Sequence, residues 1–399
     1  MSLPRYPKYK DSGVQWPLEV PAHWEVCAVK RVAALRSGET IGPDEIEEIG
    51  QFPVYGGNGL RGYAAAFTHD GNFALIGRQG ALCGNVNYAS GRFWASEHAV
   101  VATPRVPTST TWLGELFRAM NLGQFSVSAA QPGLAVDRIR NLSIPRPPLE
   151  EQEAITTFLE GETGKIDALI EEQRRLIELL KEKRQAVISH AVTKGLNPDA
   201  RTRESNTALG AIPEHWQVTV IKRFSTLQRG HDLTDAERTD GPYPVVTSGG
   251  ISGTHGSFKA HAPGIVTGRY GSTGKLFFIE EDFWPHNTAL YVVDFHGNDI
   301  RFVWYSLQSV DFAAHSAKAA VPGIDRNDIH VLPVAVPPLD EQSEIATFLD
   351  DETARYDLLT VEATRAIVLL QERRSALISA AVTGQLDIRK HEKQLEALA

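Results

Sequence analysis

The sequence repeats itself at a separation of 190 residues. Residues 147–196 and 337–386 are identical at 27 of 50 positions without a gap. A weaker repeat precedes each copy, since residues 20–38 (VPAHWEVCAVKRVAALRSG) resemble residues 212–230 (IPEHWQVTVIKRFSTLQRG). Solenoid repeats are about 20 to 50 residues long. The longer period therefore indicates a duplicated, domain-sized unit.

Between these anchors the two copies share only short islands, such as residues 76–80 (IGRQG) and 267–271 (TGRYG). This pattern predicts a variable domain at 1–146 and a first long connecting helix at 147–196. A second variable domain follows at 197–336, and a second long helix with a C-terminal tail at 337–399. Two diverged domains on similar connectors suggest one mechanical task performed on two different targets.

The repeated segments have the periodicity of long helices. Pro147 and Pro148 precede an acidic first turn, which suits a helix start. Residues 151–193 would span about 64 Å if helical throughout, although Gly161 and Gly164 favour an early break or kink. Apolar residues follow a stripe expected to pack one helix on the other: Ile166, Leu169, Ile170, Leu176, Ile177, Leu180, Tyr356, Leu359, Ile367 and Leu370.

Such a helix cannot bury its stripe against itself. Because each half supplies one, we expect an antiparallel, coiled-coil-like pair with a pseudo-twofold axis. The alternative is a homodimeric coiled coil between two chains. The variable domains combine short β-rich runs, turn signals and stretches that could be helical. The predicted fold class is α+β, with two duplicated α/β-mixed domains separated by the two long helices.

Charge and cysteine content narrow the function classes. The net charge of −9 excludes attachment to nucleic acid by bulk positive charge alone, although residues 1–146 carry +2 and residues 197–336 carry −3. Two cysteines provide neither a disulfide framework nor a four-cysteine zinc site. With no apolar run of about 20 residues and no signal-like start, we expect a cytoplasmic protein without membrane association.

Catalytic motifs are incomplete. GNGLRG at 57–62 has the glycines of a dinucleotide fingerprint but lacks the following helix, and GRYGSTGK at 268–275 has the wrong spacing for a phosphate loop. His391-Glu392 lacks the second histidine of a zinc motif, and no nucleophile elbow is present. We therefore expect no catalytic residues, no bound metal and no cofactor in this chain.

A Gly-Arg-x-Gly turn follows an apolar strand in both copies. Its arginine, Arg78 or Arg269, could fork onto a phosphate or onto guanine, or could equally tie the loop to a carboxylate or carbonyl. Gln79 and Tyr270 differ between the copies and are candidates for sequence-dependent contact. The other candidate DNA contacts are Arg61, Arg92, Lys259 and Lys275. His23 and His215 precede tryptophans, where a packed, architectural pair is the favoured interpretation.

Several motifs together resemble the specificity (S) subunit of type I restriction-modification systems. They are KYKDSGVQW, VPAHW, GRQGALCGNVNY, FWASEHAVV, QPGL and IPRPPLEEQEAITTFLEGET, with PPL-[ED]-EQ occurring twice, each time leading into a long helix. The resemblance covers nearly the whole chain. The second copy departs from it at His286-Asn287-Thr288, where the first has Ser96-Glu97-His98.

The resemblance implies a non-catalytic reader of double-stranded DNA. Each variable domain would be a target recognition domain for one half of a split site, and the helices would set the gap and dock two methyltransferase (M) subunits. Those partners would use S-adenosylmethionine to methylate adenine, and motor-nuclease (R) subunits would use ATP and Mg. Rival interpretations are an orphan or exchangeable specificity chain without a nuclease, a protein-only coiled-coil scaffold, and an enzyme in its own right.

Overall fold

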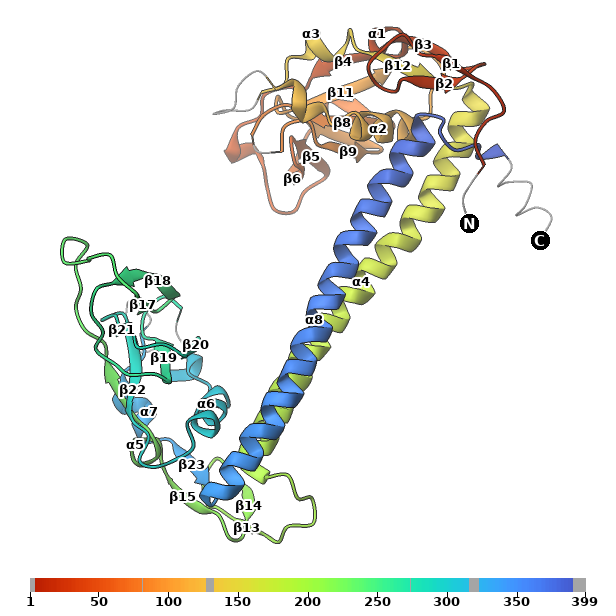
Figure 1. Ribbon diagram of the computed structural model, residues 1–399. Coiled ribbons are helices and arrows are strands. Elements are labelled where there is room, and N and C mark those ends of the chain that lie inside the picture. The colour runs from red at the N-terminus through yellow and green to blue at the C-terminus, as the bar shows by residue number, and fades with distance from the viewer. Residues whose placement is uncertain (1–3, 81, 127–132, 273, 316–322, 390–399) are drawn as a thin grey trace. The chain divides into compact units, whose positions relative to one another are not determined.

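The computed structural model describes residues 4–80, 82–126, 133–272, 274–315 and 323–389 (Figure 1). The chain forms two compact units, here called unit 1 (Met1–Gln173 with Arg365–Ala399) and unit 2 (Arg174–Thr364). Each unit contains one variable domain and part of each long helix. No helix among the described residues combines the length and hydropathy needed to cross a bilayer.

Unit 1 has four sheets, with strand orders β1-β2, β6-β5-β10-β7, β4-β11-β8-β9 and β12-β3. Its strands are β1 (Tyr9–Asp11), β2 (Glu19–Pro21), β3 (Glu25–Ala28), β4 (Ala33–Ser37), β5 (Phe52–Gly56), β6 (Gly59–Ala64), β7 (His69–Asp70), β8 (Phe73–Gly77), β9 (Val86–Ala89), β10 (Arg92–Ala95), β11 (Ala99–Pro104) and β12 (Ser143–Arg146). Its helices are α1 (Val29–Val32), η1 (Pro43–Glu45), α2 (Thr110–Ala119), η2 (Leu122–Phe125), α3 (Val136–Ile139), the first part of α4 (Leu149–Lys194) and the last part of α8 (Leu339–Val382).

Unit 2 repeats this plan, with strand orders β13-β14, β18-β17-β21, β16-β22-β19-β20 and β15-β23. Its strands are β13 (Thr202–Glu204), β14 (Ala211–Pro213), β15 (Gln217–Val220), β16 (Thr226–Arg229), β17 (Tyr243–Thr247), β18 (Gly250–His255), β19 (Gly264–Gly268), β20 (Leu276–Ile279), β21 (Trp284–Pro285), β22 (Ala289–Asp294) and β23 (Pro333–Val336). Its helices are α5 (Ile221–Phe224), α6 (Ile300–Gln308), η3 (Ala313–His315), α7 (Arg326–His330), the last part of α4 and the first part of α8 (Leu339–Val382). The predicted duplication and the α+β fold class are confirmed.

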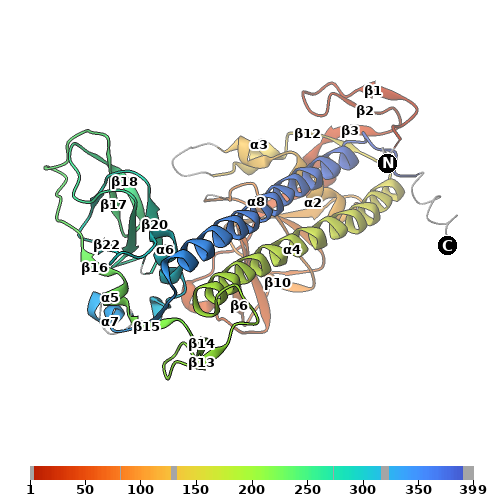
Figure 2. The ribbon, with the colours of Figure 1, turned by 60° about the horizontal axis from the view of Figure 1, so that its bottom comes forward.

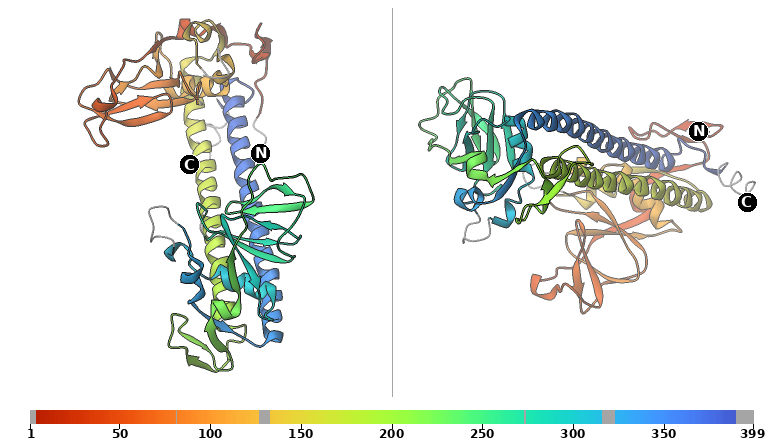
Figure 3. Two further views of the ribbon diagram at one scale, coloured as in Figure 1. Left: turned by 90° about the vertical axis from the view of Figure 1, so that its left-hand side faces the viewer. Right: turned by 90° about the horizontal axis from the view of Figure 1, so that it is seen from below.

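Each variable domain has a central four-stranded sheet with apolar side chains on both faces. In unit 1, Ile76 and Val100 face the main core with α2, whereas Leu75 and Val101 face a second cluster with Phe93 of β10. This alternation follows from the two-residue period of a strand. In unit 2, α6 lies between the equivalent sheet and the long helices (Figures 1 and 3).

The long helices α4 and α8 lie side by side and antiparallel (Figure 2). In unit 1 the Arg374 guanidinium donates to Asp167, with Nε 2.9 Å from Oδ1. In unit 2 the Arg184 Nε donates to Asp357 Oδ1 at 3.1 Å. The two ion pairs are equivalent under the 190-residue repeat, as a twofold-related antiparallel pair requires. The expected helix pair is therefore confirmed.

Helix α4 continues through Gly161 and Gly164, so the expected break is wrong. The two glycines are exposed, and buried side chains on either side, Phe158 and Ile166, hold this stretch in place. The cost of about 1 kcal/mol for a glycine in a helix interior is small beside that packing.

Only part of the predicted apolar stripe is buried. Ile166, Ile170 and Leu180 are buried, and Ile177, Tyr356, Ile367 and Leu370 are half-buried. Leu169, Leu176 and Leu359 are instead 45%, 42% and 40% exposed, which differs from the predicted packing. The reason is that two helices alone bury a narrow seam, so other apolar side chains of each helix remain exposed. Further exposed apolar residues on the two helices are Leu179, Leu358, Val361, Val368 and Leu369.

The repeated Glu-Gln pair explains how each helix start is attached to its domain. Glu151 accepts hydrogen bonds from Trp24 Nε1 and Tyr6 Oη, both at 2.9 Å, and contacts His23 Nε2 at 2.6 Å. The Gln152 amide donates to the Pro147 carbonyl and accepts from the Ser109 backbone. In unit 2, His215 contacts Glu341 at 2.8 Å, and Gln342 makes the equivalent contacts. The two histidines therefore have architectural partners.

Candidate nucleic-acid interface

In unit 1 the ends of three strands meet at one edge of the domain. Strands β5 and β10 are parallel, so both end on the same side, and the Ser96 amide donates to the Tyr55 carbonyl at 2.9 Å. The Arg78 amide, directly after β8, donates to the His98 carbonyl at 2.8 Å. This edge thus collects the 56–59 turn, the 77–80 turn and the 96–98 loop.

Both glycines of the Gly-Arg-x-Gly turn are required by its geometry. A Cβ on Gly77 would lie 2.8 Å from the Leu82 carbonyl oxygen, and Gly80 has φ +87°. In unit 2, a Cβ on Gly268 would lie 2.9 Å from the Ser248 oxygen, and Gly271 has φ +73°. Glycine is the residue that tolerates both close approach and positive φ.

The turn presents its arginine while the backbone is held on both sides. The Arg78 carbonyl accepts from the Leu134 amide at 2.8 Å, and Gln79 forms a bridge with Gly133. In unit 2, the backbone amide of Arg269 donates to the Thr288 carbonyl at 3.0 Å, and the Arg269 carbonyl accepts from the Ile324 amide at 2.9 Å. Tyr270 forms a β-bridge with Gly323. The two turns therefore have the same backbone scaffold. Arg78 is half-buried, and its guanidinium has no hydrogen bond or ion pair among the described residues.

In unit 2 this edge contains a cleft of about 450 Å³. The Arg269 guanidinium lies 4.6 Å from the centroid of the Tyr270 ring, and Arg229 and Arg326 also line the cleft. The carboxylate of Asp325 accepts from the Asn327 amide at the start of α7. The cleft is lined by Arg229, Arg269, Tyr270, Leu290, Gly323, Ile324, Asp325 and Arg326. Arginines and an exposed aromatic ring are suited to phosphates and base edges.

The loop at which the second copy departs from the family pattern keeps its backbone contacts. Ala99 donates to the Ser96 carbonyl, and Ala289 donates to the His286 carbonyl, both at 2.9 Å. The side chains differ, because Asn287 donates a short hydrogen bond to Asp232. That bond, followed by the charge of Arg229, lowers the pKa of Asp232. The loops are thus equivalent in backbone and distinct in chemistry.

The remaining candidate residues do not gather at one site. Arg61 is exposed on β6 with its Cδ against Gly56 of the 56–59 turn, and Lys275 accepts from the Gly268 amide through its carbonyl. Lys259 lies 5.2 Å above the Trp284 ring. Arg92 starts β10, at the opposite end from Ser96, where it pairs with Asp70 at 3.1 Å. The structure does not bring Arg92 to the Arg78 edge.

Sequence reasoning missed Arg229 and Arg326. Arg229 is the last residue of β16, before Gly230, and Arg326 is the first of α7. Neither belongs to a recognisable motif. Their positions at element ends near Gly-Arg-x-Gly become informative only once the strand order brings those ends together.

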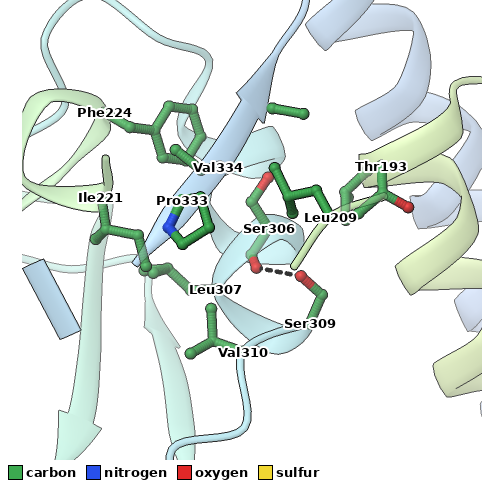
Figure 4. A pocket seen from close by; sticks show the side chains of 12 residues that line it. Thr193, Leu209, Ile221, Phe224, Ser306, Leu307, Ser309, Val310, Pro333 and Val334 are labelled. Carbon is green, nitrogen blue, oxygen red and sulfur yellow. Dashed lines mark hydrogen bonds between the residues drawn. The ribbon is translucent and has the colours of Figure 1, made fainter. Parts of the chain in front are cut away.

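A second cavity in unit 2 is far smaller, about 30 Å³, and lies between α6, α5, β23 and α4 (Figure 4). Its lining is mainly apolar, with Ser306 and Leu307 facing Phe224 and Val334. A space of that size holds a water and no cofactor. The described residues contain no cluster of three or more metal-ligating side chains.

Both halves of the chain are similar to known sequences. The family described as "Type I restriction modification DNA specificity domain" matches residues 21–179 and 213–366. The Type I restriction enzyme EcoprrI specificity subunit of Escherichia coli is 42% identical over 133 residues, 32% of this chain and 33% of that protein. The chain thus matches about a third of that relative's length. The EcoDI specificity subunit of Escherichia coli is 19% identical over 414 residues, 92% of this chain and 90% of that protein.

Solved structures share the fold over nearly the whole chain. A chain from a study of complex assembly and conformational transition of the type I R-M system aligns with a TM-score of 0.73 at 14% identity, covering 93% of this chain and 100% of that chain. The HsdS subunit from Thermoanaerobacter tengcongensis aligns with a TM-score of 0.52 at 15% identity, covering 93% and 99%. At these identities the likeness concerns the fold.

Proposed function

Because the chain belongs to the family of type I restriction-modification DNA specificity subunits, we propose that it is the non-catalytic DNA-recognition subunit of such a complex. Each variable domain reads one half of a split, asymmetric site in double-stranded DNA. A cytoplasmic location is part of this proposal.

One observation carries the proposal: the two units hold an arginine on the same backbone scaffold and surround it with different side chains. Gln79 follows the arginine in unit 1, whereas Tyr270 follows it in unit 2. Phosphate contacts position a protein on a duplex, and contacts to base edges specify the sequence. Two equivalent scaffolds with different side chains suit two half-sites of different sequence.

The long helices set the gap and dock two methyltransferase subunits in this proposal. The apolar side chains that the long helices leave exposed, such as Leu358 at 59% and Val361 at 64%, support a protein partner there. The methyltransferase subunits bring S-adenosylmethionine, and motor-nuclease subunits bring ATP and Mg. Because this chain has a net charge of −9, the methyltransferase subunits also supply positive charge that neutralises DNA phosphates in this proposal.

Methylation mapping of host DNA tests the proposal, with the complete complex expressed as wild type, Arg78→Gln or Arg269→Gln. The wild type should yield a split motif with methyladenine in each half. Each variant should relax one half only, by about 1–3 kcal/mol of discrimination if the arginine forks onto guanine. Arg92→Gln, at the far end of β10, is the matched control and should leave the motif unchanged.

Other outcomes distinguish the rivals. The absence of any methylated motif, together with no protection of duplex DNA by the complex, would favour a protein-only scaffold. A split methylated motif without cleavage of unmodified DNA would favour a specificity chain that works without a nuclease.

A further inference from the structure

Unit 1 contains a basic pocket of about 360 Å³ that lies apart from the Gly-Arg-x-Gly edge. It is bounded by α1, the end of α3, the segment after β11, and β4, which is an edge strand of the central sheet. The residues lining it, here called the β4 pocket, are Lys30, Ala33, Ala34, Leu35, Arg36, Arg105 and Arg140. Four are basic and none is acidic.

Backbone hydrogen bonds hold these cations together. The Lys30 amide donates to the Arg140 carbonyl at 2.9 Å, which joins α1 to the end of α3. The Arg105 amide donates to the Val32 carbonyl at 2.8 Å. Arg36 is fixed in the β4–β11 ladder opposite Val101. Four separate segments of unit 1 therefore each contribute one basic residue to the lining of the same pocket.

Most of this positive charge is not neutralised within the described residues. The Lys30 ammonium donates to the amide oxygen of Asn141 at 2.9 Å, and the Arg105 guanidinium donates to the Lys30 carbonyl at 3.2 Å. Both acceptors are uncharged. Arg140 pairs with an exposed carboxylate, Asp137, at 3.1 Å. The Arg36 guanidinium has no hydrogen bond or ion pair with any residue that the structure describes. Like charges in one cleft repel one another, so a bound anion would stabilise the arrangement.

The equivalent positions of unit 2 carry only one of these four basic residues. By the alignment of the two copies, Lys30 corresponds to Lys222, while Arg36, Arg105 and Arg140 correspond to Gln228, Phe295 and His330. His330 is buried and accepts a hydrogen bond from the Leu227 amide at 3.0 Å. The pocket is thus a specialisation of unit 1, the variable domain that has the positive net charge.

We propose that the β4 pocket binds a phosphate group and, resting on the function proposed above, that this phosphate belongs to the backbone of the DNA held by unit 1. Arginine guanidinium groups fork onto phosphate oxygens and a lysine adds a point charge. Such a contact fixes the position of the duplex and carries no sequence information. The contact therefore adds to the salt dependence of DNA binding by unit 1.

The test compares the wild-type complex with Arg36→Gln/Arg140→Gln on a target duplex and on an unrelated duplex. We expect both affinities to fall by the same factor, about tenfold, and the slope of log affinity against log salt to decrease by about 1 to 2. The methylated sequence should not change. Arg31→Gln is the matched control, because Arg31 is exposed on the same α1 helix but does not line the pocket.

A second arm uses inorganic phosphate and the full chain without DNA. A ligand that binds the folded state raises the midpoint of thermal unfolding, so phosphate should raise the midpoint of the wild type, relative to chloride at equal ionic strength, more than that of the double variant.

If this difference appears while duplex affinity and salt slope are unaffected, the ligand is a free phosphate and the assignment to DNA is overturned. If neither arm separates the variant from the wild type, the pocket is not a phosphate site. A wild-type complex that binds no duplex would overturn the proposed function, and the phosphate arm alone would then decide the pocket.

Discussion

Ser306 occupies a core position of unit 2 whose equivalent in unit 1 is the fully buried Leu116. The exposure of Ser306 is 4%, and its hydroxyl has no hydrogen-bond partner among the residues that the structure describes. Because a buried hydroxyl without a partner costs free energy, Ser306→Ala should raise the free energy of unfolding of unit 2 by about 1 kcal/mol. Denaturant unfolding measures the change. Ser309→Ala, which removes a hydrogen bond to the Ser306 carbonyl at 2.7 Å, should lower it. A loss of stability in Ser306→Ala would show that the hydroxyl has a partner, such as a water in the adjoining cavity.

His330 makes the stability of unit 2 depend on pH. Burial, followed by the charges of Arg326 and Lys222, lowers its pKa, and its Nε2 accepts from the Leu227 amide, which requires the neutral ring. The unfolded chain takes up a proton as pH falls through about 6.5 while the folded chain does not. Stability contributed by the neutral ring is therefore complete above that pH and is lost as pH falls towards the lower folded pKa. His330→Gln should flatten the dependence of unfolding free energy on pH between 7 and 5. An equally steep dependence in the variant would assign it to another group of unit 2, such as His231, whose pKa burial also lowers.

Among single residues, the turn arginines were predictable from the sequence because the same Gly-Arg-x-Gly motif occurs in both copies of the repeat. Glycines on both sides of Arg78 and Arg269 reflect close backbone approach and positive φ, which are local requirements. Arg229, Arg326 and the basic residues of the β4 pocket come from segments far apart in the chain. They become neighbours only through the strand order, which no single-sequence pattern specifies.

Among the elements, the antiparallel arrangement of the two long helices was predictable from the sequence, but the residues that pack between them were predicted only in part. The repeat supplied two equivalent helices, and the ion pairs Asp167–Arg374 and Arg184–Asp357 agree with the antiparallel arrangement. The apolar stripe, however, is wider than the seam that two helices bury. Periodicity alone cannot tell a residue that faces the other helix from one, such as Leu169, that faces outward.

Removing seven residues from equivalent positions in the middle of α4 and α8 tests the role of the pair as a spacer. Each deletion removes about 10 Å at 1.5 Å per residue, so the gap in the methylated motif should contract by about 3 base pairs at about 3.4 Å each. Both half-site sequences should stay the same, because the variable domains are untouched. Methylation mapping of DNA modified by the complex measures both. Altered half-sites with an unchanged gap would contradict the spacer role.

At the scale of the whole molecule, each unit has its own core, its own central sheet and its own Gly-Arg-x-Gly edge. Recognition by one unit should therefore be independent of recognition by the other. The residues that attach a unit to the helices, the repeated Glu-Gln pair and its partners, are similar in both copies, whereas the side chains at the edges differ. Evolution could thus exchange one unit's edge while leaving the helix attachment intact.

Replacing residues 20–140 with the matching segment of a relative that recognises another target tests this independence. The exchange keeps Tyr6, Glu151 and the helix α4, and it replaces the whole Arg78 edge together with the β4 pocket. We expect one half of the methylated motif to take the relative's sequence, while the other half and the gap remain as in the wild type. The reciprocal exchange, of residues 212–330, should alter the other half alone. A change in both halves after either exchange would mean that the two units read one continuous surface, since independent units have no means of altering each other's contacts with bases.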